Sequence, residues 1–257
     1  MSTARNPWLS SPSSGPRPRL RLFCFPHAGG SAAPYKVWAR ELTPAVEVCP
    51  VLLPGRDRRL NEPAMPDLMA LAAAAAEGMR PALDVPFVLF GHSMGALLAF
   101  EVTRVLGARH GLVPERLYAS AYRAPHLPHR TRHRGQLPRD ELIQELMAMG
   151  GTPPQLSQHP ELWDLVLPTM RADFTACESY RHVQSSPLEC PITALGGVAD
   201  ALVDEEELRA WQEHTRGPFQ VRRFPGGHFF LQTAQELVLH LLNQDLEALL
   251  AAGSGRP

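Results

Sequence analysis

A serine between two glycines is the first feature of the sequence that could do chemistry. Residues 91–95 read Gly-His-Ser-Met-Gly, a match to the pattern G-x-S-x-G. The apolar segment Phe87–Phe90 precedes this pentapeptide, and an apolar segment typical of a helix follows it from Ala96. A strand, a tight turn and a helix in this order expose a serine hydroxyl at the end of a sheet. We therefore expect Ser93 to be a nucleophile rather than part of a surface turn.

A serine hydroxyl needs an adjacent base, and His228 is the best placed of the eleven histidines. It lies in residues 225–229, Pro-Gly-Gly-His-Phe, between an expected strand and the last expected helix. In sheets that present a serine on such a turn, the serine, the acid and the histidine follow in that order along the chain. His27 and His92 also lie near the serine, but we expect them to pack against strand ends.

Two aspartates compete to orient His228. Asp200 follows the expected strand Ile192–Leu195 through a Gly-Gly-Val-Ala segment, which places it at the carboxyl end of that strand. Asp204 comes four residues later and also fits the N-cap of a helix expected at Glu205–Glu213. Capping would hold its carboxylate elsewhere, so we favour Asp200 as the acid.

The oxyanion that forms during acyl transfer needs two backbone N–H donors. Met94, the residue after the nucleophile, is expected to supply one. The other should come from the loop after an early strand, and Pro26–Ser31 follows the expected strand Leu20–Phe25. Its two glycines would let the backbone approach the site closely. We assign the second donor to Ala28; a glycine turn without a catalytic part is the alternative.

No metal site is predicted. His126, His129 and His133 are close in sequence, but no carboxylate or cysteine joins them at ligand spacing. The four cysteines are scattered, at Cys24, Cys49, Cys177 and Cys190. They contain no CxxC pair, so we expect free thiols that serve as small apolar side chains, in keeping with a reducing cytoplasm.

The segments that must position these groups alternate between strands and helices. Strands are expected at Leu20–Phe25, Val46–Leu53, Phe87–Phe90, Leu117–Tyr122, Ile192–Leu195 and Phe219–Phe224. Helices are expected at Asp67–Leu83, Ala96–Leu106, Arg139–Met149, Glu161–Tyr180, Glu205–Glu213 and Ala234–Leu250. This alternation predicts one α/β domain over residues 19–257, with a mainly parallel sheet flanked by helices.

The alternation pauses between Tyr122 and Ile192, an interval far longer than the dozen or so residues that a crossover needs. Two expected helices with apolar faces fill it. We predict an inserted helical lid over about residues 125–187, which shapes a pocket above Ser93 and opens as a mobile cap. A rigid structural insertion is the alternative.

Composition and charge exclude several classes of partner. The formal net charge of −1 gives no basic field for nucleic acid or an anionic membrane. The Arg/His-rich stretch His126–Arg134, with Pro125 before it and Pro128 within it, is expected to be a solvated loop. The longest apolar run, Leu68–Ala76, is too short to span a bilayer. Residues 1–18 lack the apolar stretch of a secretory signal and are expected to form a disordered leader whose removal changes little.

Six segments together resemble the type II thioesterases of polyketide and nonribosomal peptide assembly lines, members of the α/β-hydrolase superfamily. They read Phe-Cys-Phe-Pro-His-Ala-Gly-Gly at 23–30, Leu-Pro-Gly-Arg at 53–56, Gly-His-Ser-Met-Gly at 91–95, Gly-Gly-Thr-Pro at 150–153, Arg-Ala-Asp at 171–173 and Pro-Gly-Gly-His-Phe at 225–229. The family also often carries Ser-Gly-x-Arg-Ala-Pro. Residues 120–125 match that motif except at Ala121, where alanine replaces glycine and is expected to narrow the acyl pocket.

The resemblance implies the α/β-hydrolase fold and a serine thioesterase. Such an enzyme removes acyl groups from the phosphopantetheine arm of acyl or peptidyl carrier proteins through an acyl-serine, for editing or release. It implies no metal and no organic cofactor, because the pantetheine belongs to the partner. The residue chemistry leaves two alternatives open, a small-molecule carboxylesterase or lipase and a non-catalytic binding protein on a hydrolase scaffold.

Overall fold

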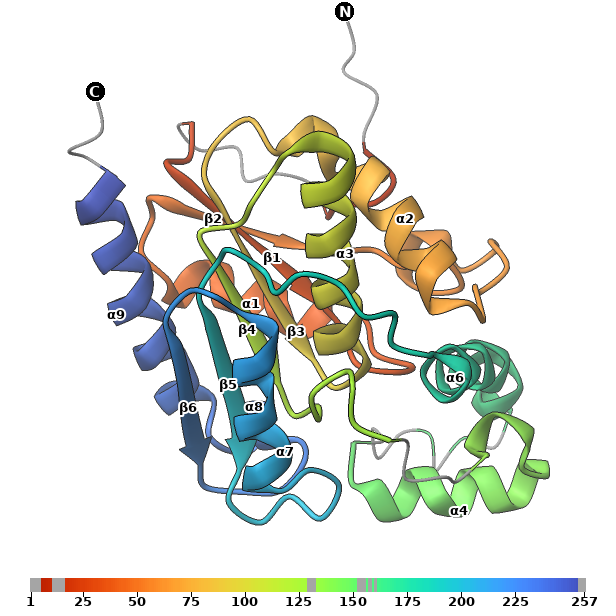
Figure 1. Cartoon of the computed structure of the whole chain (residues 1–257). Helices are drawn as coiled ribbons and strands as arrows, with labels where there is room; N and C mark the ends of the chain where they lie inside the picture. Colours follow the sequence, from red (N-terminus) through yellow and green to blue (C-terminus); the bar gives the residue numbers. More distant parts are fainter. Residues whose placement is uncertain are drawn as a thin grey trace, which may run out of the picture.

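The computed structural model describes residues 6–10, 17–128, 133–151, 156, 159 and 161–253. A six-stranded parallel sheet forms its centre, in the order β2-β1-β3-β4-β5-β6 (Figure 1). The strands are β1 Leu20–Phe25, β2 Val46–Pro50, β3 Phe87–His92, β4 Arg116–Ser120, β5 Ile192–Gly197 and β6 Phe219–Phe224. This confirms the predicted α/β class, and the wholly parallel pairing explains why β3 is apolar at every early position.

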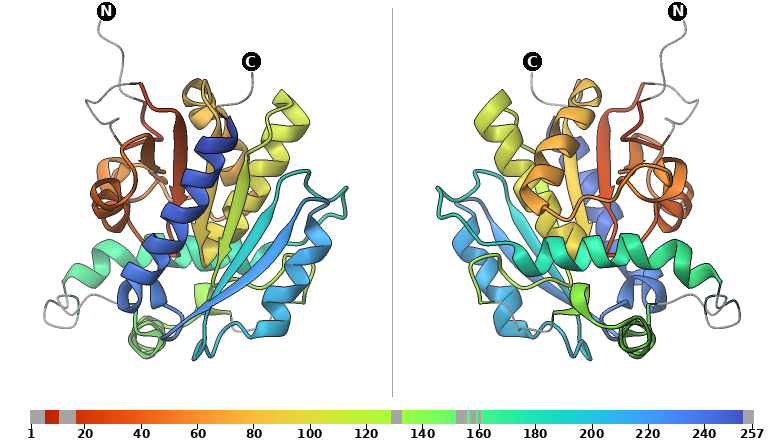
Figure 2. Two further views of the ribbon diagram at one scale, coloured as in Figure 1. Left: turned by 90° about the vertical axis from the view of Figure 1, so that its left-hand side faces the viewer. Right: turned by 90° about the vertical axis from the view of Figure 1, so that its right-hand side faces the viewer.

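Helices cover both faces of this sheet (Figures 1 and 2). They are α1 Ala33–Glu41, α2 Leu68–Met79, α3 Met94–His110, α4 Arg139–Met149, α6 Leu162–Ser179, α7 Glu205–Arg209, α8 Phe230–Thr233 and α9 Gln235–Gly253. Side chains alternate along β1: Phe23 and Phe25 pack in the core shared with α2 and α3, whereas Leu22 and Cys24 pack in the core shared with α1 and α9. The two-residue period of a strand thus divides the core into two layers.

Local signals explain most of the element boundaries. The Asp67 side chain accepts a hydrogen bond from the N–H of Ala70 at 2.9 Å and so caps the N-terminus of α2. That helix ends at Met79, earlier than expected, because Pro81 takes part in a short 3₁₀ turn that follows it. Strand β4 ends at Ser120 because Ala121 adopts a φ of +52°, which is incompatible with a continuing strand.

Helices α4 and α6 lie across the carboxyl ends of the strands and form the described part of the predicted insertion (Figure 2). They share a small apolar core of their own, made of Leu142, Leu146, Leu156, Trp163, Leu167, Met170 and Phe174. Their apolar faces therefore pack against each other and against the top of the sheet domain, as the spacing of the leucines and methionines predicts. Residues 129–132 and 152–155 of this insertion lie outside the described residues.

The structure corrects the prediction of a disordered leader for residues 6–10. Leu9 is buried and forms an antiparallel bridge with Val51, and the carbonyl of Trp8 accepts a hydrogen bond from the N–H of Leu52 at 2.8 Å. The guanidinium of Arg59 lies 4.0 Å from the centre of the Trp8 ring. Two adjacent apolar residues suffice to dock this segment, whereas residues 1–5 and 11–16 lie outside the described residues.

Replacing Trp8 by alanine is expected to lower the free energy of unfolding by about 2 kcal/mol, because apolar contact and the cation–π interaction with Arg59 are both lost. Urea denaturation measures this change. The matched control is Leu237→Ala, whose side chain is 52% exposed and should change stability by less than about 0.5 kcal/mol. Equal stability of the Trp8 variant and the wild type would mean that this segment does not dock.

Candidate active site

Ser93 occupies the sharp turn between β3 and α3. Its backbone adopts φ +54° and ψ −123°, a strained conformation that costs about 1–3 kcal/mol for a residue other than glycine. Both flanking glycines are required by close approach. A Cβ at Gly91 would lie 2.0 Å from the carbonyl oxygen of Gly95, and a Cβ at Gly95 would lie 2.2 Å from that of Phe25. The turn therefore needs the pattern that was found in the sequence, and it lifts the serine hydroxyl off the sheet.

The structure brings Ser93, His228 and Asp200 into one hydrogen-bonded row. His228 Nε2 lies 3.0 Å from Ser93 Oγ, and His228 Nδ1 lies 2.9 Å from Asp200 Oδ2. The other carboxylate oxygen of Asp200 accepts hydrogen bonds from the N–H groups of Leu202 and Val203, at 2.8 and 3.3 Å. The acid is fully buried and fixed by the backbone, so it can hold the imidazole in one orientation.

Asp204 has the structural task that its position predicts. Its side chain accepts a hydrogen bond from the N–H of Glu207 at 2.9 Å, and the Glu207 side chain accepts one from the N–H of Asp204 at 3.0 Å. This reciprocal capping box starts α7. The carboxylate that contacts His228 is that of Asp200.

The two expected oxyanion donors lie beside Ser93. Met94 is the first residue of α3, so its N–H is one of the helix N-terminal groups that have no partner within the helix. Ala28 lies in a turn that is closed by a 2.8 Å hydrogen bond from the N–H of Gly30 to the carbonyl of His27. Ala28 and Ser93 together line two cavities. The backbone at both positions can therefore reach a group bound to Ser93.

The two other histidines near the site are held uncharged. Burial, with the neighbouring side chains of His228 and Arg56 in support, lowers the pKa of His27 to about 4. Burial also lowers the pKa of His92 well below its usual value, and His92 Nδ1 lies 2.8 Å from Ser120 Oγ. These two rings pack edge to face on each other, while His228 alone of the three contacts Ser93 by a hydrogen bond in the described residues.

Two cavities of about 570 and 340 Å³ meet at Ser93. Both are lined by Ala28, Ser93, Met149 and Phe174. The larger also touches the charged side chains of Arg123 and Glu178, whereas the smaller is lined largely by apolar side chains of α4 and α6, such as Val166 and Met170. A substrate with two arms joined at a reactive carbonyl could place one arm in each cavity.

Ala121, which replaces the glycine of the resembling family, lines the larger cavity. Its φ of +52° is left-handed, a conformation that glycine adopts at lower cost. The preference for glycine at this position therefore has a backbone cause, and the side chain of Ala121 is fully buried in the apolar core shared with α1 and α9.

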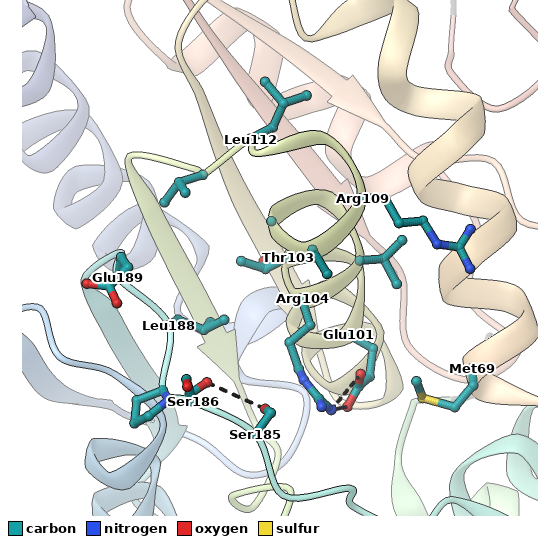
Figure 3. Close-up of a pocket in the computed structure, with 15 residues that line it drawn as sticks. Met69, Glu101, Thr103, Arg104, Arg109, Leu112, Ser185, Ser186, Leu188 and Glu189 are labelled. Carbon is teal, nitrogen blue, oxygen red and sulfur yellow. Dashed lines mark hydrogen bonds and ion pairs between the residues drawn. The ribbon is translucent and has the colours of Figure 1, made fainter.

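A further cavity of about 530 Å³ runs along the carboxyl-terminal half of α3, away from Ser93 (Figure 3). Arg104 donates hydrogen bonds to both carboxylate oxygens of Glu101, at 2.8 and 3.0 Å. Glu101 is fully buried and also accepts a hydrogen bond from the hydroxyl of Tyr180 at 2.6 Å. Glu101 and Arg104 are thus committed to each other, and we place the reactive site at Ser93.

A buried ion pair beside the site was missed by sequence reasoning. Arg56 and Asp173 are joined by two hydrogen bonds of 2.7 Å each. They are 117 residues apart, and the only signal in the sequence was that both lie in segments shared with the resembling family. Their contact with the turn at Ala28 is taken up below.

No cluster of three or more His, Cys, Asp or Glu side chains among the described residues is arranged to hold a metal ion. His126 instead lies 2.7 Å from His214, and His129 is outside the described residues. All four cysteines are free and buried, as expected. Over the same residues, no helix has both the length and the apolar character needed to cross a bilayer.

Comparison with known proteins places this geometry in a family. Residues 20–246 match the family model described as "Thioesterase domain". The chain is 39% identical over 251 residues to a Brevibacillus parabrevis protein named Linear gramicidin dehydrogenase LgrE, covering 96% of this chain and 95% of that protein. It is 41% identical over 226 residues to Thioesterase PikA5 of Streptomyces venezuelae, covering 87% and 80%.

The solved structure of the type II thioesterase BorB, from the borrelidin biosynthetic cluster, is 38% identical and superimposes with a TM-score of 0.86. The match covers 95% of this chain and 99% of that one. The family model and these relatives span the sheet, the strained serine turn and the helical insertion alike. The chain therefore belongs to the thioesterase family and is a serine hydrolase of the α/β-hydrolase fold, similar to the type II thioesterases.

Proposed function

We propose that this thioesterase hydrolyses acyl groups from the phosphopantetheine arm of acyl or peptidyl carrier proteins, as an editing or release enzyme of polyketide, nonribosomal peptide or fatty acid synthesis. The observation that carries the proposal is the row Ser93–His228–Asp200 at the junction of two cavities. A carrier-bound thioester is a molecule with two arms, the acyl chain and the pantetheine, and the reactive carbonyl lies between them. The names of PikA5 and BorB support the same reaction.

The reaction proceeds in two halves through an acyl-serine. His228, oriented by Asp200, takes the proton of Ser93 as the hydroxyl oxygen attacks the thioester carbonyl carbon. The N–H groups of Ala28 and Met94 bind the resulting oxyanion. The carbon–sulfur bond then breaks, and His228 gives its proton to the leaving sulfur.

Hydrolysis of the acyl-serine reverses the roles. His228 takes a proton from a water molecule, the water oxygen attacks the ester carbonyl, and the same N–H groups bind the second oxyanion. Ser93 regains its proton as the acid leaves. Every proton moves between groups named here, so the proposal requires neither a metal nor an organic cofactor.

We assign the catalytic domain to residues 19–257, with a lid at about 125–187, and we place the reaction in the cytoplasm, where free thiols persist. The dehydrogenase name of the Brevibacillus relative points to hydride transfer instead. The contacts around Ser93 favour acyl transfer. The buried carboxylate of Asp200 holds the imidazole of His228, and this imidazole lies within hydrogen-bond distance of the Ser93 hydroxyl.

The proposal is tested by comparing one acyl group on three leaving groups: a carrier protein, free pantetheine and p-nitrophenol. We expect kcat/KM to be at least about tenfold higher on the carrier than on pantetheine, because contacts remote from the reacting bond contribute to the transition state. Equal or faster turnover of the p-nitrophenyl ester would favour a carboxylesterase. Absence of turnover on all three, with no labelling of Ser93 by a fluorophosphonate, would favour a binding protein.

A further inference from the structure

We propose that Asp173 of α6 is a positioning residue for the reaction. Together with Arg56, it fixes the turn that carries the Ala28 oxyanion donor and joins this turn to the lid helix. The inference rests on the proposed function, since it concerns the donor that we assign to Ala28.

Residues 27–30 form a turn with the features of type II. The N–H of Gly30 donates to the carbonyl of His27 at 2.8 Å, and Gly29, the third residue of the turn, has a φ of +70°. In a trans peptide the N–H points away from the carbonyl, so the bond to the His27 carbonyl also sets the direction of the Ala28 N–H. The catalytic donor therefore keeps its direction only while this turn stays closed by the hydrogen bond between Gly30 and His27.

Asp173 holds the central peptide of this turn. Its Oδ2 accepts a hydrogen bond from the N–H of Gly29 at 2.7 Å. Types I and II of a turn differ by a flip of the peptide between the second and third residues, here Ala28 and Gly29. A carboxylate that accepts the Gly29 N–H stabilises one orientation, and a charge-assisted bond is about twice as strong as a neutral one.

Arg56 neutralises the carboxylate and grips the same turn. Its guanidinium donates to both oxygens of Asp173 at 2.7 Å, and it also donates to the carbonyl of Gly30 at 3.3 Å. Asp173 is 1% exposed and Arg56 is 6% exposed. An unpaired buried carboxylate near Ser93 would oppose the negative charge of the oxyanion, so the paired arginine lets an acid serve as the anchor.

The same helix is fixed to the sheet domain at two further points. The Thr169 hydroxyl donates to the carbonyl of Gly55 at 2.7 Å, and Met170 packs so closely on the turn that a Cβ at Gly29 would lie 2.7 Å from its side chain. Phe174, one residue after Asp173, lines both cavities at Ser93. These contacts hold α6 and the oxyanion turn together as one body.

The test is Asp173→Asn, assayed with an acyl-pantetheine thioester and the matching p-nitrophenyl ester. An asparagine has one side-chain oxygen for the N–H groups of Gly29 and Arg56, whereas the carboxylate of Asp173 has two, so part of its contact with the turn and with Arg56 is lost. We expect kcat to fall about 10- to 100-fold on both substrates, with KM changed less than threefold, because a misplaced donor affects the transition state more than binding. Affinity for an alkyl boronic acid, which forms a tetrahedral anion on Ser93, should fall by the same factor.

The matched control is Glu101→Gln, which also removes a buried carboxylate that is paired with an arginine. Glu101 is bonded to Arg104 and to the Tyr180 hydroxyl, and it lies at the cavity along α3, away from the oxyanion turn (Figure 3). We expect its kcat and boronate affinity to stay within twofold of the wild type even where its Tm falls. An unchanged boronate affinity of Asp173→Asn, or an equal loss in the control, would overturn the proposal and leave a purely structural ion pair.

Arg56→Lys keeps the charge of the pair and the Asp173–Gly29 bond, so it serves if Asp173→Asn does not fold. Because lysine lacks the two-pronged guanidinium, we expect a threefold to tenfold loss in kcat and in boronate affinity, and no loss would count against the proposal.

The two proposals fail in different ways. If the wild type hydrolyses only the p-nitrophenyl ester, the proposed function fails. The effect of Asp173→Asn on hydrolysis of that ester still tests whether Asp173 positions the oxyanion turn.

Discussion

Replacing Ser93 by alanine is expected to lower kcat for thioester hydrolysis by several orders of magnitude, on the order of 10⁵ to 10⁶, and to leave the fold intact. The variant lacks the oxygen proposed to bond to the acyl carbon, while the proposed donors, the N–H groups of Ala28 and Met94, remain. Alanine keeps the Cβ that the φ of +54° already accommodates, so the turn gains no strain. Melting temperature and steady-state hydrolysis of a carrier-bound acyl group measure the two effects.

Ser120→Ala is the matched control, because this serine also contacts a histidine of the site. Its Oγ lies 2.8 Å from His92 Nδ1, and its hydroxyl is buried. We expect a loss of less than tenfold, and labelling by a fluorophosphonate in Ser120→Ala but not in Ser93→Ala. Near wild-type hydrolysis by Ser93→Ala would remove the proposed nucleophile.

The parts of the fold that sequence could predict are those with strong local signals. Strands β1 and β3 are apolar runs, and the glycines at 91 and 95 have little room for any other residue. The expected order of serine, acid and histidine along the chain then led to Asp200 and His228. In the structure Asp200 contacts His228, and His228 contacts Ser93. Their catalytic roles are still to be tested by the variants described here.

The remaining features depend on contacts that are distant in sequence. Helix α1 was not expected, because its nine residues carry charged groups and have a proline at the second position. The docking of Trp8 rests on Arg59 and on the backbone of Leu52, which no local pattern reveals. Arg56, in the segment after β2, and Asp173 of α6 meet only when both are folded against the turn that follows β1. Pairing of this kind is set by topology, so periodicity and composition carry no trace of it.

Replacing Asp200 by asparagine is expected to lower kcat by a factor of about 10³ to 10⁴ while KM changes little. The backbone N–H groups of Leu202 and Val203 already bind one carboxylate oxygen, and an asparagine would keep its only oxygen on them. Its amide N–H₂ would then face His228 Nδ1. That nitrogen would have to accept a hydrogen bond, so the proton of the neutral ring would move to Nε2, which could no longer take the proton of Ser93.

Asp204→Asn separates this effect from the loss of a negative charge in the same loop. Asparagine is also a good N-cap, so α7 should lose about 1 kcal/mol or less, and kcat should stay within twofold of the wild type. Steady-state kinetics should show the loss of kcat in Asp200→Asn, and urea denaturation should show the small loss of stability in Asp204→Asn. If Asp204→Asn lost activity and Asp200→Asn lost only stability, the acid that orients His228 would be Asp204, and the 2.9 Å contact between Asp200 and His228 would have only a structural role.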